Sequence, residues 1–181
     1  MFGYNPVDVL VSESGVPAAL PTTHARVYVD LSRNHNTGLA IANLESTTAS
    51  ISINAYQKDG VTETGTSQGP LILAGNGHDA QFANQLFSDL PSDFTGVLDI
   101  SSPTPFAALT IRSLDNERNE FLMTTFPVAD VTRPAPSPIV FPQIADGDGY
   151  ITEFILISPT GASSSVLSLF DNSGNPLELG D

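Results

Sequence analysis

Alternation of apolar and polar residues with a period of two is the feature that most limits the fold of this chain. In the segment SISINAYQ (50–57), Ile51 and Ile53 alternate with Ser52 and Asn54. Such alternation is typical of strands that have one face in the core and the other in solvent. We therefore expect an all-β protein, an antiparallel β-sandwich. The pattern predicts strands near residues 6–12, 26–31, 37–43, 49–57, 70–74, 94–101, 105–113 and 119–126.

One short helix is expected among these strands. Phe82, Leu86 and Phe87 recur at helical spacing, and Pro91 ends the segment. We expect Asp79 to cap this helix and the helix to span two to three turns. Turns are expected between the strands at Lys58-Asp59-Gly60, Gly75-Asn76-Gly77 and Ser101-Ser102-Pro103.

The composition excludes several kinds of partner. Six basic residues face twenty acidic ones, and the formal net charge is −14. Because nucleic-acid binding needs clustered basic side chains, no nucleic-acid partner is expected. The absence of cysteine excludes disulfides, thiolate metal sites and thiol nucleophiles. No apolar run approaches the roughly 18–20 residues that span a bilayer, so no transmembrane segment is expected.

The sequence also bears on where the protein works. Residues 1–11 contain neither a basic region nor a long apolar region, so no signal peptide is visible. Ser, Thr, Asn and Gly are abundant, whereas lysine occurs once. This composition favours an exported protein, extracellular or on the cell surface.

The chain contains an internal repeat. TGLAIAN begins at Thr37 and TEFILIS begins 115 residues later, at Thr152. SISINAYQKDG ends at Gly60 and SVLSLFDNSG ends 114 residues later, at Gly174, so one deletion reconciles the two offsets. The expected organisation is an N-terminal extension with a candidate donor strand (1–21), a complete β-sandwich repeat (22–131), a Pro-rich linker (132–138) and a truncated second repeat (139–181).

The second repeat is too small to be stable alone. We count sixteen large apolar residues between Ile139 and Leu179, each contributing about 1.5–3 kcal/mol when fully buried. Ordering about forty residues costs roughly 1.5 kcal/mol apiece, which is a larger sum. We therefore expect this incomplete second β-sandwich module to need a partner, either the first repeat of the same chain or another subunit.

Large apolar residues in the second repeat suggest where that partner binds. Positions that are small or polar on the outer face of the first repeat become apolar in the second, and an exposed apolar patch usually marks an interface. The N-terminal strand can complete the second repeat in its own chain or, by β-strand addition, in the next chain. Head-to-tail donation builds rings or filaments. The expected interface residues are Val7, Val9, Val11, Ile155, Ile157, Val166 and Phe170.

A series of short motifs follows one another along the two repeats. In the first repeat they are TGLAIAN (37–43), FANQLF (82–87), LPSDFTGVLDISS (90–102), PFAALTIR (105–112) and TTFPVAD (124–130). In the second they are VFPQIADGDGYITEFILISP (140–159) and LFDNSGNPLEL (169–179). Their order resembles a tandem β-sandwich repeat of uncharacterised secreted or surface proteins of environmental bacteria. The resemblance implies an extracellular role and brings no catalytic residues.

The segment ADGDGYITEF (145–154) resembles part of a calcium-binding EF-hand loop. Placing Asp146, Asp148 and Gly149 at positions 3, 5 and 6 puts isoleucines, Ile144 and Ile155, at positions 1 and 12, where ligands are required. We therefore expect a turn between two strands. Weak calcium binding by Asp146, Asp148 and Glu153 is the alternative.

Two further motifs have chemical counterparts. Gly65–Gly69 (GTSQG) fits a hydrolase elbow, but a strand and not a helix is expected after it. Gly75–Ala80 (GNGHDA) fits a dinucleotide loop, but antiparallel strands follow and Asp79 would repel a pyrophosphate. No catalytic residue, cofactor or metal site is therefore expected. His24, His35 and His78 are expected on loops, and Asp93, Asp99, Asp115, Glu117 and Glu120 on a solvated surface.

These observations favour a non-enzymatic extracellular structural or adhesive protein. We expect it to self-assemble with copies of itself, including into filaments by β-strand addition. One alternative is a carbohydrate-binding module, in which Tyr4, Tyr28, Tyr56 and Tyr150 stack on the sugar. The other is a fragment of a longer multi-repeat surface protein.

Overall fold

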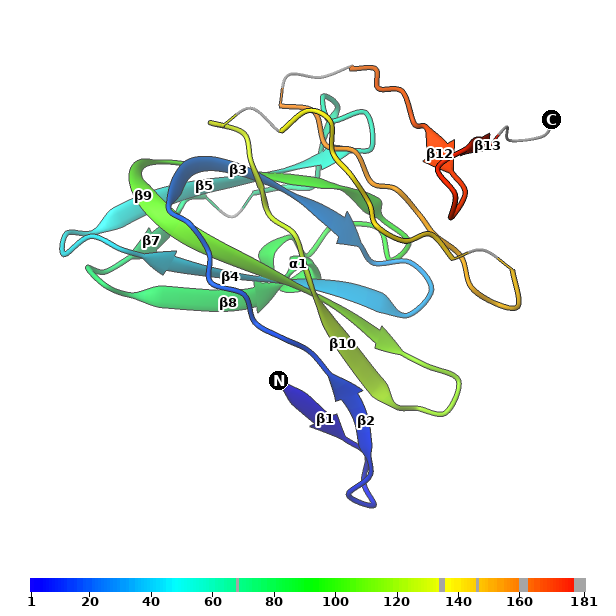
Figure 1. Ribbon diagram of the computed structural model, residues 1–181. Helices are drawn as coiled ribbons and strands as arrows, with labels where there is room; N and C mark the ends of the chain where they lie inside the picture. The colour runs from blue at the N-terminus through cyan, green and yellow to red at the C-terminus, as the bar shows by residue number, and fades with distance from the viewer. Residues whose placement is uncertain (68, 134–135, 146, 160–162, 178–181) are drawn as a thin grey trace.

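The computed structural model describes residues 1–67, 69–133, 136–145, 147–159 and 163–177 of the chain (Figure 1). In this part of the chain there are thirteen strands and one short helix, and the strands of the largest sheet are antiparallel. The expectation of an all-β, sandwich-like fold with one short helix is confirmed. None of the described segments forms a helix with the length and apolarity needed to cross a lipid bilayer.

One long strand, β9 (Thr95–Asp115), organises the fold. Its first half lies between β3 (Thr22–Asp30) and β5 (Ala49–Gln57). Its second half lies between β4 (His35–Asn43) and β10 (Phe121–Phe126), as Figure 1 shows. Four short strands extend the sheet: β11 (Ala129–Asp130) beside β3, β6 (Glu63–Thr64) and β7 (Leu71–Leu73) beside β5, and β8 (His78–Phe82) beside β4.

Both halves of this sheet contribute to a single core, in the manner of a sandwich. The core includes Ile51, Ile53 and Leu98 from the first half and Leu39, Ile41 and Phe106 from the second. The alternate residues Ser52 and Asn54 are more exposed, as the period of two predicts. The core thus lies between the two halves of the sheet.

The region between residues 94 and 113 differs from the prediction. Ser101-Ser102-Pro103 does not form a turn, because β9 continues through these residues. The strand leaves β5 at Ser101 and meets β4 at Phe106, and its register with β3 shifts between these two residues. The polar residues that resemble a turn therefore mark the point at which one strand passes from one half of the sandwich to the other.

The predicted helix is shorter than expected and begins later. Helix α1 (Ala83–Leu86) has four residues, and its N-cap is Phe82, whose backbone N–H donates to the Gln85 side chain at 2.8 Å. Asp79 does not cap it, because Asp79 lies in strand β8 opposite Ile41 of β4. Pairing with β4 therefore prevails over the local helical pattern at residues 78–82.

The N-terminal extension forms a hairpin and not the predicted strand at 6–12. Strand β1 (Phe2–Tyr4) pairs with β2 (Leu10–Glu13), and residues 5–9 form the connecting turn. The side-chain oxygen of Asn5 accepts hydrogen bonds from the backbone N–H groups of Val7 and Val9. Local hydrogen bonding by Asn5 thus explains why residues 6–9 do not continue the strand.

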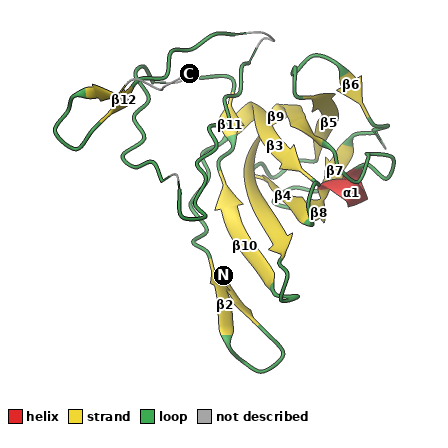
Figure 2. Ribbon diagram, turned by 90° about the vertical axis from the view of Figure 1, so that its right-hand side faces the viewer, coloured by secondary structure: helices red, strands yellow, loops and turns green. Residues whose placement is uncertain are grey.

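The second repeat contains far less regular structure than the sequence predicts. Its strands are β12 (Leu169–Phe170) and β13 (Pro176–Leu177), which form a small hairpin. The segment TEFILIS (152–158), which aligns with the predicted strand TGLAIAN, forms no strand in the described residues. A strand needs a neighbour for its backbone hydrogen bonds, and among the described residues this segment has no strand partner. In Figure 2 the C-terminal region extends away from the sandwich as a long loop that carries β12.

Candidate interaction site

The exposed apolar side chains concentrate outside the sandwich. Of the 22 large apolar side chains that are exposed in the described residues, 18 lie before Thr22 or after Asp130. The sandwich between these residues contributes the other four, Leu44, Val61, Ile72 and Phe121. Soluble folds bury most large apolar side chains, and contiguous exposed ones mark interaction sites. The two flanking segments are therefore the candidate site.

The predicted interface residues differ in exposure. Val7, Val9, Val166 and Phe170 are exposed, and Val166 retains 92% of its accessible surface. Val11, Ile155 and Ile157 are half-buried, whereas Leu156 between the last two is 65% exposed. The sequence analysis therefore missed Leu156. Leu156 alternates with Ile155 and Ile157, so in a strand its side chain would lie on the opposite face from theirs. The described residues form no strand there.

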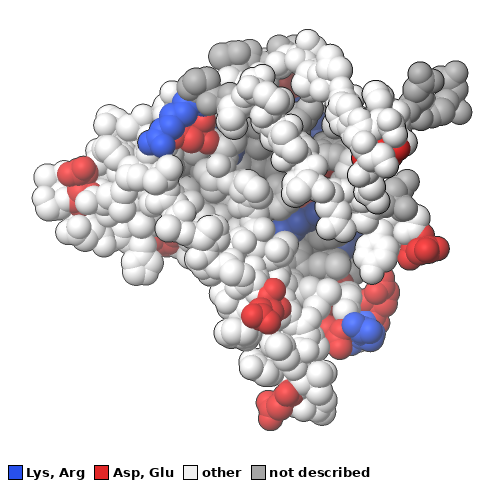
Figure 3. Space-filling model, viewed as in Figure 1, with Lys and Arg blue, Asp and Glu red and all other residues white. Residues whose placement is uncertain are grey.

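One apolar groove of about 620 Å³ lies where the flanking segments meet the sandwich. Leu20 of the N-terminal extension and Ile157 of the second repeat both line it. Phe126 and Val128, at the end of β10, contribute the sandwich side. Figure 3 shows that the face seen in Figure 1 is largely uncharged, with scattered acidic side chains and a few basic ones. Ile157 therefore lines a groove together with residues of the first repeat of its own chain, which favours one of the two arrangements that the sequence left open.

The N-terminal hairpin is attached to the edge strand β10 by serine side chains. The backbone N–H of Met123 donates to Ser12 Oγ at 2.9 Å, and Ser12 Oγ donates to the Met123 carbonyl at 3.0 Å. The backbone N–H of Thr125 donates to Ser14 Oγ at 3.0 Å. The serine hydroxyls thus occupy the hydrogen-bonding groups that a further strand would use.

A polar cluster covers the outer face of the first half of the sheet. Asp99 accepts hydrogen bonds from Arg26 Nε at 2.7 Å and pairs with His24 Nε2 at 2.9 Å. Arg26 also donates from Nη1 to the Ser158 carbonyl at 2.8 Å and lies 5.9 Å from the centre of the Tyr56 ring. The prediction that Asp99 belongs to a solvated surface is wrong, since its side chain is 13% exposed. His24 lies on strand β3, next to Arg26 on the same strand, and not on the expected loop. Through Arg26, the cluster attaches Ser158 to the first repeat.

The other two histidines also lie on strands, His35 on β4 and His78 on β8. Asp93, Asp115 and Glu117 are exposed, as expected. Among the residues that the structure describes, no group of three His, Asp or Glu side chains is placed to hold a metal ion.

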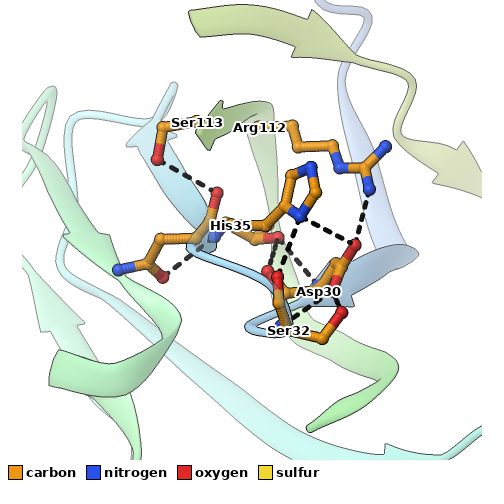
Figure 4. Close-up of polar contacts among 7 residues, drawn as sticks. Asp30, Ser32, His35, Arg112 and Ser113 are labelled. Atoms are coloured by element: carbon orange, nitrogen blue, oxygen red, sulfur yellow. Dashed lines mark hydrogen bonds and ion pairs between the residues drawn. The ribbon is translucent and has the colours of Figure 1, made fainter. Parts of the chain in front are cut away.

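A second polar cluster joins the ends of β3, β4 and β9 (Figure 4). Asp30 is 4% exposed and accepts hydrogen bonds from Arg112 Nη2 at 2.5 Å and from Ser32 Oγ at 2.6 Å. His35 Nδ1 lies 2.8 Å from the Ser32 carbonyl and 3.8 Å from the carboxylate of Asp30. In a catalytic triad the serine hydroxyl donates to the histidine. Here it donates to the aspartate, so the cluster has the geometry of a structural junction.

The carboxylate of Asp30 is stabilised in its charged form. Burial disfavours the charge, but hydrogen bonds from Ser32 and Arg112 and the charge of Arg112 outweigh it, so the pKa of Asp30 is lowered. Tyr28 lies two residues before Asp30 on β3. Burial raises the pKa of the Tyr28 hydroxyl, and the charges of Asp30 and Glu153 raise this pKa further.

The calcium candidates form a turn. Asp148 and Gly149 have positive φ angles of 50° and 90°, and the Tyr150 N–H donates to the Gly147 carbonyl at 2.9 Å. Glu153 is exposed. Asp146 lies outside the described residues. The expected turn is present, but in the described residues no strand precedes it or follows it directly.

The remaining motifs lie in loops and strands of the sandwich. Ser67 of GTSQG precedes strand β7, as predicted, and a helix does not follow it. Gly75-Asn76-Gly77 forms the expected turn, with Asn76 at a φ of 57°. Tyr28 and Tyr56 lie on either side of Val97 in the sheet, and the Tyr28 ring lies 6.0 Å from that of Phe126. Tyr4 and Tyr150 are exposed on the N-terminal hairpin and on the turn at 147–150.

Comparison with known proteins gives no family. No protein-family model matches the chain, and searches of curated proteins and of solved structures return no match. The resemblance to secreted bacterial repeats therefore stays a prediction.

Proposed function

We propose that this protein is a non-enzymatic extracellular structural or adhesive protein that self-assembles through its N-terminal extension and its second repeat. The observation that carries the proposal is the distribution of exposed apolar side chains. They concentrate in residues 1–20 and 139–177, next to a sandwich that buries its own. Each exposed large apolar side chain would gain up to about 1.5–3 kcal/mol on full burial. Contact with a neighbouring copy supplies that burial.

Two turns support the view that residues 139–177 are an incomplete copy of the sandwich. Thr37 Oγ1 accepts a hydrogen bond from the N–H of Asp30 and donates to its carbonyl, and Thr152 Oγ1, 115 residues later, makes the same two contacts with Ala145. Arg33 and Asn34 have positive φ angles, as do Asp148 and Gly149 at the same offset. The second repeat thus has the turn that joins β3 to β4 in the first.

The second matching turn joins β5 to β6. The Gly60 N–H donates to the carbonyl of Gln57 at 2.8 Å, and the Gly174 N–H donates to that of Asp171 at 3.0 Å, 114 residues later. Both glycines have positive φ angles, 67° and 83°. Local turns of the repeat are therefore present, whereas the longer strands between them are not formed by the residues that the structure describes. Sheet formation that awaits a partner explains this difference.

Size measurement tests the proposal. We expect the purified chain to form large assemblies, detected by light scattering and electron microscopy, and the variant without residues 1–20 to remain small with its sandwich folded. Val166→Asp should also weaken assembly, because Val166 is 92% exposed in the second repeat. Val61→Asp is the matched control, since Val61 is 63% exposed but lies on the sandwich. Equal particle sizes for all four proteins would refute the proposal.

A further inference from the structure

The N-terminal extension matches the sequence of strand β9. Residues 9–20 read VLVSESGVPAAL, and residues 97–109 read VLDISSPTPFAAL. After one gap opposite Phe106, seven of the twelve aligned residues are identical. The identical residues of the extension are Val9, Leu10, Ser14, Pro17, Ala18, Ala19 and Leu20.

Strand β9 has no counterpart in the part of the second repeat that the structure describes. In the first repeat β9 pairs with β3, β4, β5 and β10, so each half of the sandwich is built around it. The described part of the second repeat has counterparts of the β3–β4 turn and of the β5–β6 hairpin, but no counterpart of β9. The strand β12, which corresponds to the end of β5, pairs with β13 and in this part of the chain has no strand on its other edge.

We infer that residues 9–20 of one copy of this chain form the missing central strand of the second repeat in a neighbouring copy. The inference rests on the proposed self-assembly and names the donor, the acceptor and the register. In the first repeat Val97 pairs with Tyr56, and Leu109 pairs with Ala40. Val9 aligns with Val97, and Phe170 is the counterpart of Tyr56 at an offset of 114 residues, so Val9 is expected to pair with Phe170. Leu20 aligns with Leu109, and Ile155 is the counterpart of Ala40 at an offset of 115 residues, so Leu20 is expected to pair with Ile155.

Most residues of the inferred pairs are exposed, whereas Ile155 and Leu169 are half-buried. Val9 is 54% exposed, Leu20 is 70% exposed and Phe170 is 60% exposed. The same register places Leu10 opposite Leu169 and Ala19 opposite Leu156, which is 65% exposed. Cross-strand apolar pairs of this kind stabilise sheets. Pairing would therefore cover apolar surface on the donor and the acceptor together.

A coupled change of two residues supports this register. In the first repeat Arg26 of β3 and Asp99 of β9 are opposite each other and form an ion pair. Their counterparts are Phe141 in the second repeat and Val11 in the extension. Both charged residues are thus replaced by apolar ones, and neither replacement leaves a charge without its partner. Such an unpaired charge on a covered sheet face would be unfavourable.

The extension does not complete the second repeat of its own chain in this structure. Residues 10–13 are in β2, which pairs with β1, and Ser12 and Ser14 hold this hairpin on β10 of the first repeat. Pro21 alone separates the donor segment from β3, whose Thr22 pairs with Phe106. We therefore assign the donor role to a second copy. Because each copy then donates at one end and accepts at the other, the contact repeats head to tail, which builds rings or open filaments.

Cysteine cross-linking tests the inferred register, since the chain contains no cysteine of its own. Opposed residues in antiparallel strands have Cα atoms about 4.5–5.5 Å apart, which suits a disulfide. We expect a mixture of Val9→Cys chains and Phe170→Cys chains to form disulfide-linked dimers under mild oxidation. A mixture of Leu20→Cys and Ile155→Cys chains should do the same. The mismatched mixtures, Val9→Cys with Ile155→Cys and Leu20→Cys with Phe170→Cys, are matched controls and should cross-link at least tenfold less.

The outcomes separate this inference from the proposed assembly. Circular dichroism of each variant verifies that the sandwich is folded. Equal cross-linking in matched and mismatched mixtures would overturn the register, even if light scattering still detects large assemblies. A Val9→Cys, Phe170→Cys double variant that cross-links only within one chain would overturn the role of the second copy. Cross-linking confined to the matched mixtures supports the inference.

Discussion

Replacing Asp30 by alanine tests the buried ion pair at the junction of β3, β4 and β9. The Asp30 carboxylate accepts hydrogen bonds from Arg112 Nη2 at 2.5 Å and from Ser32 N and Oγ at 2.9 and 2.6 Å. Removing one partner of a fully buried ion pair costs about 3–5 kcal/mol. The Arg112 side chain is 27% exposed, so water can solvate part of its charge. We therefore expect Asp30→Ala to lower the free energy of unfolding by about 2–4 kcal/mol.

Urea unfolding followed by circular dichroism measures this loss, at a protein concentration low enough to keep the chain unassembled. Asp115→Ala is the control, because Asp115 is an exposed residue of the same region and should change the free energy by less than about 0.5 kcal/mol. Arg112→Met completes a double-mutant cycle in which the double variant should lose less than the sum of the single variants. A loss under about 0.5 kcal/mol for Asp30→Ala, or simple additivity in the cycle, would refute the assigned ion pair.

Three further predictions concern acid, backbone contact and calcium. The pKa of Asp30 is lower in the folded protein, so its charge stabilises the fold at pH values above the unfolded pKa of about 4, and this stability is lost as the pH falls through the folded pKa. The melting temperature should therefore decrease below about pH 4, and the decrease should be less steep in Asp30→Asn. An equally steep decrease in both proteins would exclude this role of Asp30. Gly96→Ala should cost several kcal/mol in urea unfolding, because a Cβ there would lie 2.2 Å from the Tyr56 carbonyl oxygen, while Gly15→Ala, with no atom within 4 Å, should be neutral; similar stabilities would contradict the close approach of β9 and β5. Calcium or a chelator should leave the melting temperature unchanged, because Ile144 and Ile155 occupy the two required ligand positions of the EF-hand loop, and an increase with calcium that Asp148→Ala abolishes would favour a calcium site.

The sequence predicted the strands of the first repeat well because their hydrophobic pattern is local. Leu39 and Ile41 face the core together with Ile51 and Ile53, as their alternation indicates. Gly60 lies in the predicted turn with a positive φ angle, a conformation that glycine adopts without strain. Period and turn chemistry act over a few residues, so one sequence is enough to find them.

The polar cluster around Asp99 was missed because its members are distant in the sequence. Asp99 is 73 residues from Arg26 and 75 from His24. Only the register between β3 and β9 makes them neighbours, and no local pattern contains that register. The strand at 78–82 was missed for a related reason, because pairing with β4 competes there with a helical spacing of apolar residues.

The amino-acid sequence by itself determined the all-β class, most strand positions, the turns at residues 58–60 and 75–77, and the two offsets of the repeat. The tertiary structure decided which segments become strands, because a strand is stable only when another strand satisfies its hydrogen bonds. TGLAIAN has β8 and β9 as neighbours and forms β4, whereas TEFILIS, with a similar pattern, has no strand beside it in the described part of the chain and is irregular. The alternating pattern shows that a segment can form a strand, but the strand forms only where a second strand is available to pair with it.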